Sequence, residues 1–394
     1  MTTDAPRGAR LSRAAVTVLA VAAGGAIAND YALQPTLTQI ADGFGAPLAL
    51  VTVVLSAAML GYLLGLALLV PLIDVLAPRR VIPAQLVVLA LALTLAAAAP
   101  SAAVLIGCFV LVGAATTVAA QASAVVGKHS DTRDRAHRMA AVSAGISAGI
   151  LLSRVVGGIL TDWLGWRGAL LSFAAFVALC ALALYPLLPT TSPQNPADYF
   201  TTVRALPRLL RDLPELRRPS FAGMLWFFAF NLIWVGLAIR LAAPPYNLDA
   251  TSIGLYSLAG ILGLIVTRIA GRLSDRYGPR AVILAGTIIA TGAAVVLILA
   301  LGTPVVTAIA LAIFDAGCFA AQVANQARVV SLDPERAGAL GATYLTLYYA
   351  AGAAGTLTAG FVMTNAGWTA TAATAAITVG AAAALTFATR PRAA

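Results

Sequence analysis

The feature that most restricts how this chain can fold is a series of apolar segments, separated by charged residues, proline or glycine. About 20 apolar residues in a helix cross the hydrocarbon core of a bilayer. Only helices and closed barrels satisfy the backbone hydrogen bonds in lipid, and these segments lack the alternation of barrel strands. We therefore predict an all-α membrane protein with twelve transmembrane helices. The predicted helices cover residues 14–35, 47–70, 81–99, 102–126, 139–161, 167–188, 219–242, 251–271, 281–301, 303–329, 337–363 and 366–388.

The composition agrees with a membrane protein and argues against several other classes. Hydrophobic residues make up 60% of the chain and charged residues 10%, whereas a soluble domain carries about 25% charged residues. The three cysteines lie inside apolar segments, which argues against a disulfide framework or a metal cluster. The sequence contains no phosphate-binding loop, serine nucleophile elbow or paired catalytic acids. We therefore expect neither an enzyme nor a cofactor, and no use of ATP by this chain.

The positions of the basic residues predict the orientation in the membrane. Cytoplasmic loops carry an excess of Lys and Arg, and with a cytoplasmic N-terminus most of the 25 basic residues fall on that side. They gather in segments 7–13, 128–138, 204–218 and 272–280. We expect a multi-pass protein of the inner or plasma membrane with both termini in the cytoplasm. This placement explains the net charge of +10 without a nucleic-acid partner.

A long connection divides the chain into two similar parts. Residues 189–218 are rich in Pro, Arg and polar residues, and they separate an N-terminal six-helix bundle, 1–188, from a C-terminal one, 219–394. Several short motifs recur 201 or 202 positions later. These are Asp74 and Asp275, Pro78 and Pro279, Arg79 and Arg280, Ala119-Ala120-Gln121 and Ala320-Ala321-Gln322, and Gly165-Trp166 and Gly367-Trp368. Six helices return the chain to its starting side, so we predict a parallel repeat about an axis along the membrane normal.

The charged segment from Gly271 to Arg280 resembles the Gly-x-x-x-Asp-Arg-x-Gly-Arg-Arg motif of the major facilitator superfamily, with Pro279 as the variation. The earlier copy keeps Asp74 and an Arg-Arg pair but has Val70 where glycine is expected. Other segments are similar to the arabinose-efflux-like permeases of that superfamily, near the drug:proton antiporters. These segments are 28–35, 61–65, 153–158, 165–167 and 325–326.

The resemblance implies that the two charged segments act as latches. Each Asp is expected to lie against a neighbouring helix N-terminus and an Arg, which holds the cytoplasmic side closed during part of the transport cycle. The alternative, ordinary positively charged loops, explains the arginines but not the matching frames. The latch candidates are Asp74, Arg79, Arg80, Gly271, Asp275, Arg276, Gly278 and Arg280.

Three ionisable residues lie deep in predicted helices, where charge costs at least a few kcal/mol, and they are the candidates for proton coupling. Asp30 and Arg154 lie at similar depth, so they are able to pair if their helices touch. Asp315 lies near the midplane with no basic neighbour evident in its own half. The alternatives are a static ion pair and a neutral, hydrogen-bonded Asp.

Polar and aromatic residues of the same helices are candidates for lining a substrate cavity. The resemblance implies a central cavity between the first, fourth, seventh and tenth helices. The cavity candidates are Asn29, Tyr31, Gln34, Gln121, Trp226, Phe230, Trp234, Gln322 and Asn325. Some of the polar groups are expected instead to join helices, and some of the aromatic rings to face lipid.

We expect a secondary active transporter that works by alternating access, with a small-molecule substrate, protons and the lipid bilayer as its partners. The predicted function is proton-coupled efflux of a small apolar or cationic organic compound. The alternative is an uptake permease for a small organic solute. A monomer is the expected oligomeric state.

Overall fold

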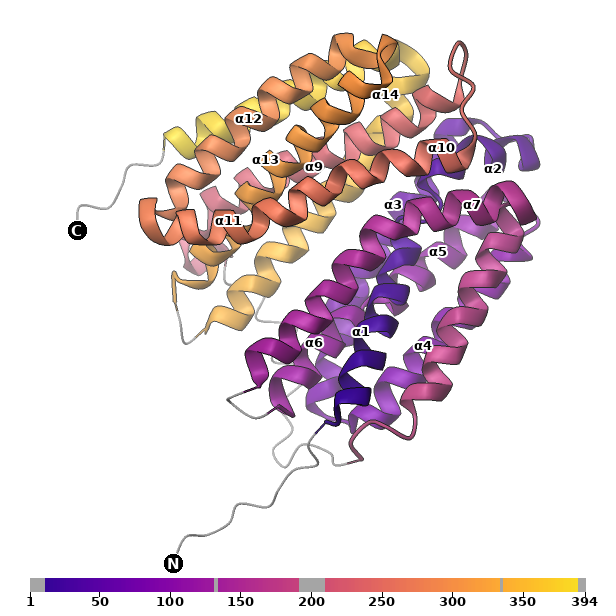
Figure 1. The fold of residues 1–394 in the computed structure, drawn as a ribbon, viewed down its shortest axis with the longest axis vertical. Helices are drawn as coiled ribbons and strands as arrows, with labels where there is room; N and C mark the ends of the chain where they lie inside the picture. Colours follow the sequence, from indigo (N-terminus) through magenta and orange to yellow (C-terminus); the bar gives the residue numbers. More distant parts are fainter. Residues whose placement is uncertain (1–10, 131–133, 191–209, 334–335, 389–394) are drawn as a thin grey trace, which may run out of the picture.

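The computed structural model describes residues 11–130, 134–190, 210–333 and 336–388, and these residues form helices and turns without a strand (Figure 1). Ten helical stretches are long and apolar enough to cross a bilayer. The first half contains α1 (Arg13–Ile27), η1 (Ala28–Asp30), η2 (Gln34–Thr36), α2 (Leu37–Phe44), α3 (Leu48–Leu68), η3 (Val70–Asp74), α4 (Pro78–Ala97), α5 (Ala102–Thr116), α6 (Val118–Lys128) and α7 (Arg135–Leu184). The second half contains α9 (Pro214–Ala242), α10 (Ala250–Leu255), η4 (Tyr256–Gly260), α11 (Ile261–Tyr277), α12 (Pro279–Leu299), η5 (Ala300–Gly302), α13 (Pro304–Val330) and α14 (Ala337–Phe387).

The longest helix of the first half, α7, reverses direction at Gly165. This glycine has a φ of 71°, a backbone conformation that residues other than glycine rarely adopt. Before the turn, Arg138 donates to the carbonyl of Leu11 at 2.7 Å. Just after it, Arg167 donates to the carbonyl of Ala99 at 3.0 Å. Beyond the second arm, the carbonyl of Pro189 accepts a hydrogen bond from the backbone N–H of Arg79, near the N-terminus of α4. Helix α7 therefore consists of two antiparallel arms joined at Gly165.

The longest helix of the second half, α14, reverses in the same way at Gly367, which has a φ of 72°. Trp368 donates to the carbonyl of Leu297 at 2.9 Å, and Arg280 donates to that of Phe387 at 2.6 Å. The second arm therefore runs antiparallel to α12. The predicted count of twelve membrane-crossing helices treats each arm as a separate span, and it stays a prediction.

The first predicted helix, 14–35, is wrong as one continuous helix. The α-helix ends at Ile27 and short 3₁₀ turns follow, up to Thr36. Asn29 turns its side chain back to the carbonyls of Gly25 and Ala26, at 2.8 and 3.1 Å. Pro35 lacks a backbone N–H and begins a 3₁₀ turn. The polar residues of this segment consequently lie in an interrupted helix.

Other predicted boundaries also need correction. The expected loop 271–280 is mostly helical, because α11 continues to Tyr277 and only Gly278 separates it from α12. The predicted helix 251–271 begins as α10 and η4, and 102–126 is divided at Thr117 into α5 and α6. The predicted connection 189–218 lies partly outside the described residues, and its last five residues already belong to α9.

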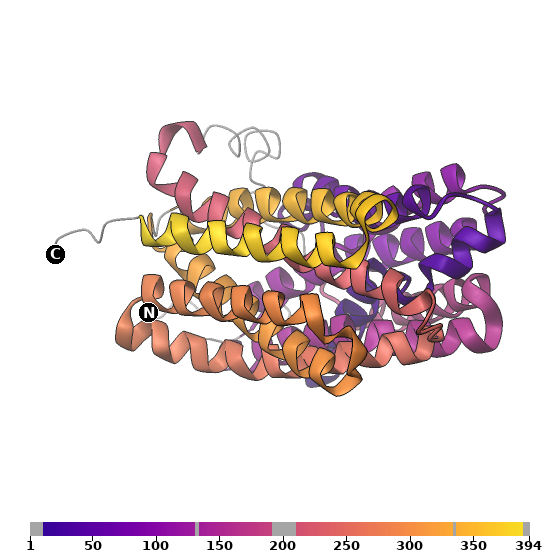
Figure 2. The same cartoon turned by 90° about the horizontal axis from the view of Figure 1, so that it is seen from above.

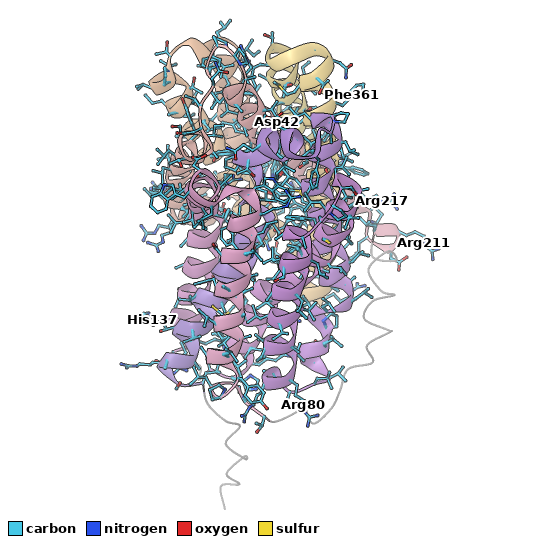
Figure 3. All side chains as sticks on the ribbon, turned by 90° about the vertical axis from the view of Figure 1, so that its right-hand side faces the viewer. Asp42, Arg80, His137, Arg211, Arg217 and Phe361 are labelled. Atoms are coloured by element: carbon cyan, nitrogen blue, oxygen red, sulfur yellow. The ribbon has the colours of Figure 1, made fainter. Side chains whose placement is uncertain are left out.

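The two halves form separate bundles that meet at one end (Figure 1). We call the end that carries α2 and α10 the α10 end, and the opposite end, where α1 begins and α14 ends, the termini end. Figure 2 shows the two bundles side by side from above. In Figure 3, Asp42 lies at one end of the first half, and Arg80 and His137 lie at the other.

Two of the contacts between the halves are alike. Helix α3 packs against the first arm of α14, where the Ser56 hydroxyl donates to the carbonyl of Ala353 at 3.0 Å. The segment α10–η4 packs against the first arm of α7, where the Ser257 hydroxyl donates to the carbonyl of Leu151 at 2.8 Å.

A carboxylate adds a third link between the halves at the α10 end. Asp162, near the end of the first arm of α7, accepts hydrogen bonds from the backbone N–H of Thr251 at 2.8 Å and of Ala250 at 3.3 Å. The Thr251 hydroxyl donates to the same carboxylate at 2.6 Å, and the amide of Gln39 lies 3.4 Å away. These links hold the halves together at the α10 end, whereas the bundles diverge toward the termini end (Figure 1).

Helices within a half approach one another closely where glycine lies at the contact. A Cβ added at Gly113 of α5 would overlap the carbonyl group of Ala58 on α3. A Cβ at Gly149 of α7 would overlap the backbone of Gly24 on α1. Small residues permit such contacts in membrane proteins, so these pairs fix the helix spacing inside the first half.

Candidate functional site

The buried ionisable residues gather in one layer between the two halves. Asp30 and Arg154 belong to the first half. Asp315 belongs to the second half, together with its neutral neighbour Trp234. Each of these four side chains is less than 5% exposed. The layer lies where η1, α7, α9 and α13 converge, so it receives groups from both halves.

Arg154 occupies the centre of this layer. Its Nε donates to the amide oxygen of Gln34 at 2.5 Å, and its guanidinium lies 4.4 Å from the ring centre of Trp234 and 4.9 Å from that of Tyr31. Cations are attracted to aromatic ring faces at such distances. The Nη2 atom of Arg154 and the Nε2 atom of Gln34 are buried without a hydrogen-bond partner in the described part of the chain.

Trp234 connects Arg154 to the carboxylate of the second half. Its indole Nε1 donates to Asp315 Oδ1 at 3.1 Å, and Arg154 interacts electrostatically with Asp315 across the interface. No basic neighbour of Asp315 was expected within its own half. The structure brings one from the other half instead.

Asp30 has a different partner. Both of its carboxyl oxygens lie 3.1 Å from the Thr116 hydroxyl, which also lies 2.8 Å from the carbonyl of Gly113. A hydroxyl carries one hydrogen, so Thr116 donates either to the carbonyl or to Asp30. When it donates to the carbonyl, a protonated Asp30 is able to donate to Thr116 in turn.

The structure does not join the two ionisable residues that were expected to be able to pair. Helices α1 and α7 do pack together. Asp30 contacts Thr116, however, and Arg154 contacts Gln34 and Trp234. No ion pair between Asp30 and Arg154 is present among the described residues.

The remaining polar candidates divide between the layer and the interior of each half. Tyr31 and Gln34 lie beside Arg154. Gln121 instead donates to the carbonyl of Leu69 at 2.8 Å and to the side chain of Gln85 at 2.9 Å, which joins α6 to its neighbours.

Three further polar candidates make bonds inside their own halves. Asn29 bonds to its own helix. Asn325 donates to the carbonyl of Pro219 at 2.9 Å, and Gln322 accepts from the Tyr344 hydroxyl. Both second-half contacts hold α13 against α9 and α14.

The aromatic candidates belong to a larger cluster that sequence reasoning did not identify. Phe230 lies 6.3 Å from Trp234, measured between ring centres. The ring of Phe227 stacks on Tyr348 at 3.8 Å, and Tyr349 contacts Tyr62 of the first half at 4.6 Å. Three tyrosines of α14 recur at helical spacing, Tyr344, Tyr348 and Tyr349, a pattern that could have indicated this face. Trp226 is fully buried, and its Nε1 has no partner among the described residues.

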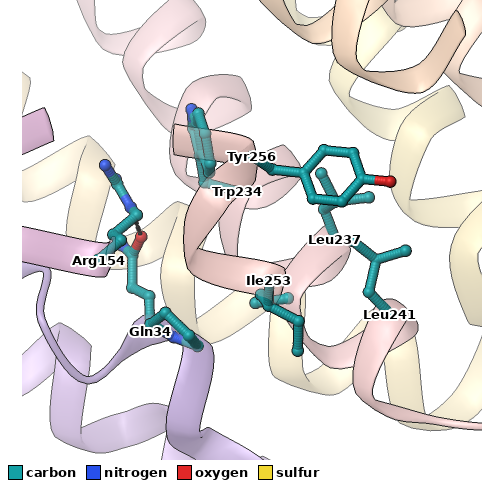
Figure 4. Close-up of a pocket in the computed structure, with 9 residues that line it drawn as sticks. Gln34, Arg154, Trp234, Leu237, Leu241, Ile253 and Tyr256 are labelled. Carbon is teal, nitrogen blue, oxygen red and sulfur yellow. Dashed lines mark hydrogen bonds between the residues drawn. The ribbon is translucent and has the colours of Figure 1, made fainter. Parts of the chain in front are cut away.

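A small cavity adjoins Arg154 on the side facing the α10 end (Figure 4). Its volume is about 10 Å³, enough for about one water molecule. Gln34, Arg154 and Trp234 form its polar side, and Leu237, Leu241 and Ile253 are among its apolar walls. A substrate-sized space at this position therefore requires the halves to move apart.

The first latch segment makes contacts within its own half. Asp74 forms an ion pair with Lys128 rather than with an arginine. The guanidinium of Arg79 lies 4.4 Å from the ring centre of Tyr185, and Arg80 lies at the termini end (Figure 3). Among the described residues, the expected contact between Asp74 and an arginine is therefore not present.

The second latch segment continues helix α11. Gly271, Asp275 and Arg276 lie on α11, and Gly278 ends it with a φ of 82°. Arg280 donates to the last carbonyls of α14, at 3.3 and 2.6 Å, the position where cations satisfy a helix C-terminus. Among the described residues, no latch side chain bonds to the other half.

Comparisons with known proteins agree with this architecture. The sequence model of the Major Facilitator Superfamily matches residues 19–356. The probable transporter SCO4007 of Streptomyces coelicolor is 34% identical over 92% of this chain and 84% of its own length. The uncharacterized transporter YgaY of Escherichia coli O157:H7 is 29% identical over 91% of each chain. Among solved structures, the nucleoside transporter NupG is similar in fold, with a TM-score of 0.75 at 14% identity over 95% of this chain and 97% of its own.

Proposed function

The chain belongs to the Major Facilitator Superfamily, and from this membership we propose that it is a proton-coupled secondary transporter of a small organic compound. The compound would bind in the layer that contains Arg154, Trp234 and Asp315. The contact of Arg154 with Trp234 is the observation that carries the proposal, because it places a buried charge where two separate bundles meet.

The distribution of contacts supports alternating access to this layer. Asp162 links the halves at the α10 end, and the two serine hydroxyls link them close to the layer, with Leu151 three residues before Arg154 on α7. The bundles diverge toward the termini end (Figure 1). Breaking the three links and closing the opposite end would expose the same layer to the other side. Such rocking of two repeats about a midplane site is a known mode of secondary transport.

Two buried carboxyl groups support the coupling to protons. Asp30 and Asp315 are each within hydrogen-bond reach of a neutral group, and Arg154 offsets at most one negative charge. One proton that crosses a potential of 100 mV releases about 2.3 kcal/mol. One or two such groups therefore suffice for accumulation of a solute.

We propose that both termini and the latch segments face the cytoplasm, in the inner or plasma membrane, and that the protein acts as a monomer. The excess of Lys and Arg near the termini end supports this orientation. The α10 end would then face outward, and the structure would represent a state open to the cytoplasm.

The direction of transport has two candidates. Efflux of an apolar or cationic compound is typical of the branch that segments 28–35 and 153–158 resemble. Uptake of a small organic solute is favoured by one observation: Arg154 is positively charged, and the amide donor of Gln34 beside it has no partner among the described residues.

Proteoliposomes with a pH-sensitive dye inside would test the coupling. Ethidium and benzoate, each added to either side, serve as a cationic and an anionic probe. We expect proton movement that depends on one of the probes and is lost in Asp315→Asn or Asp30→Asn. Unchanged coupling in both variants would remove these two residues from the mechanism. The exposed Asp42→Asn is the matched control.

A further inference from the structure

We infer that Arg154 and Gln34 form a subsite for a carboxylate group of the transported compound, and that this carboxylate replaces Asp315 as the counter-charge of Arg154. The inference rests on the proposed transport function. It names the substrate class of that same site and departs from the apolar or cationic class that the sequence suggests.

The first observation is a pair of unused donors beside one cavity. Buried polar groups in proteins are nearly always hydrogen-bonded, yet Arg154 Nη2 and Gln34 Nε2 have no partner among the described residues. The assignment of the Gln34 amide follows from Arg154, because Nε of Arg154 can only donate and must face the amide oxygen. Both residues line the cavity of Figure 4. Two unpartnered donors on residues that line one cavity suit the two oxygens of a carboxylate.

The second observation is the character of the other walls. Leu237, Leu241 and Ile253 line the same cavity. These apolar side chains suit the carbon body of a small organic acid. Ile253 belongs to α10, the helix held by Asp162, so the cavity enlarges toward the α10 end when that contact opens.

The third observation is the balance of charge around Asp315. The groups that interact with Asp315 are Arg154 from α7 and Cys318 on its own helix. Helix α9 contributes the neutral Trp234, η4 contributes Gly260, and α14 contributes Tyr348, which interacts with Cys318. Arg154 is thus the cation that faces Asp315 within the described residues.

A consequence for coupling follows from this balance. A substrate carboxylate on Arg154 places a second negative charge near Asp315. Like charges in a low-dielectric site cannot both persist, so Asp315 binds a proton as the anion binds. Anion and proton then travel in the same direction, which agrees with the uptake candidate.

A binding measurement on the purified full-length protein tests the subsite without any ion gradient. The probes are benzoate, benzylamine and benzyl alcohol, which share a ring and differ in charge. We expect benzoate to raise the midpoint of thermal unfolding in a concentration-dependent manner, and the other two to raise it less. Arg154→Gln and Gln34→Leu should each weaken benzoate binding, whereas Arg268→Gln, an exposed arginine of α11, should not.

The variant Asp315→Asn separates the two substrate classes. It removes the competing negative charge, so we expect benzoate to bind about tenfold more tightly, a common size for coupling between sites, and its affinity to lose most of its dependence on pH. Weaker benzoate binding in this variant, preferential binding of benzylamine, or full benzoate affinity in Arg154→Gln would overturn the inference. These outcomes leave the proton-flux test of the proposed function unaffected. Absence of probe-dependent proton flux in the parent protein, with benzoate binding intact, would instead refute the proposed function.

Discussion

Ser56 and Ser257, which lie 201 residues apart, make equivalent hydrogen bonds across the interface between the halves. Each hydroxyl donates to a carbonyl on the first arm of the opposite half's longest helix, at 3.0 Å to Ala353 and at 2.8 Å to Leu151. The two acceptors are themselves 202 residues apart. The repeat in the sequence is therefore present in the contacts that join the two halves.

Removing these two hydroxyls should favour opening at the α10 end. A net hydrogen bond contributes about 1 kcal/mol, so we expect Ser56→Ala or Ser257→Ala to raise the open population about fivefold each. The measurement is the rate at which an impermeant maleimide labels a cysteine placed at Leu241, in a background without the three native cysteines. Leu241 is buried beside the small cavity. Equal labelling rates in parent and double variant would contradict this role.

Asp162→Ala should open the same end by a separate route. The variant removes an acceptor that holds the start of α10 through two backbone N–H groups and the Thr251 hydroxyl. Since the carboxylate is exposed and screened by water, we expect the closed α10 end to lose about 1 kcal/mol of stability, below the usual range for charged hydrogen bonds. The same labelling assay reports this loss. The control is Asp42→Ala, which removes another exposed carboxylate from the α10 end (Figure 3). A control that labels as fast as Asp162→Ala would show that the effect is nonspecific.

Gly113→Ala should destabilise the first half. The added methyl group would overlap the carbonyl of Ala58 on α3, and overpacking of this kind costs about 1–3 kcal/mol. Thermal unfolding in detergent measures the effect. Gly107→Ala, on the same helix, is the matched control because no atom lies within 4 Å of the added carbon. We expect the control to keep the parent midpoint, and a similar loss in both variants would argue against the packing explanation.

Asp249→Ala should weaken α10 in a pH-dependent way. Asp249 accepts a hydrogen bond from the backbone N–H of Ser252 at 2.7 Å, and its bonds to Ser252 lower the pKa of this carboxyl group below its usual value. A lowered pKa stabilises the fold above the unfolded value of about 3.9, and this contribution disappears as the pH falls through the folded value. We therefore expect faster hydrogen exchange in α10 at pH 7, and a difference from the parent that shrinks as the pH falls below the unfolded value. A difference that persists at low pH would assign the effect to packing.

Local apolar patterns predicted several helices within a few residues. The segment 47–70 corresponds to α3 (Leu48–Leu68), and 281–301 corresponds to α12 (Pro279–Leu299). These segments carry their signal within a single uninterrupted run. The break after Ile27 was not predicted, because the composition stays apolar while Asn29 and Pro35 disturb the backbone.

Contacts between residues far apart in the sequence could not be predicted from local sequence patterns. Asp162 lies one residue after a predicted helix, and its partner Ala250 is 88 residues away. Likewise, Lys128 and Thr116 were not recognised as partners of Asp74 and Asp30. Such pairs depend on how the helices pack against one another, and the residue spacing within one segment does not reveal that packing.

The turns at Gly165 and Gly367 have a mechanical consequence. In α7, the first arm carries Asp162 and the second packs against α4. A single glycine joins them and leaves no slack between the arms. We therefore expect the two arms of each hairpin to move together, and each half to move as one body during transport.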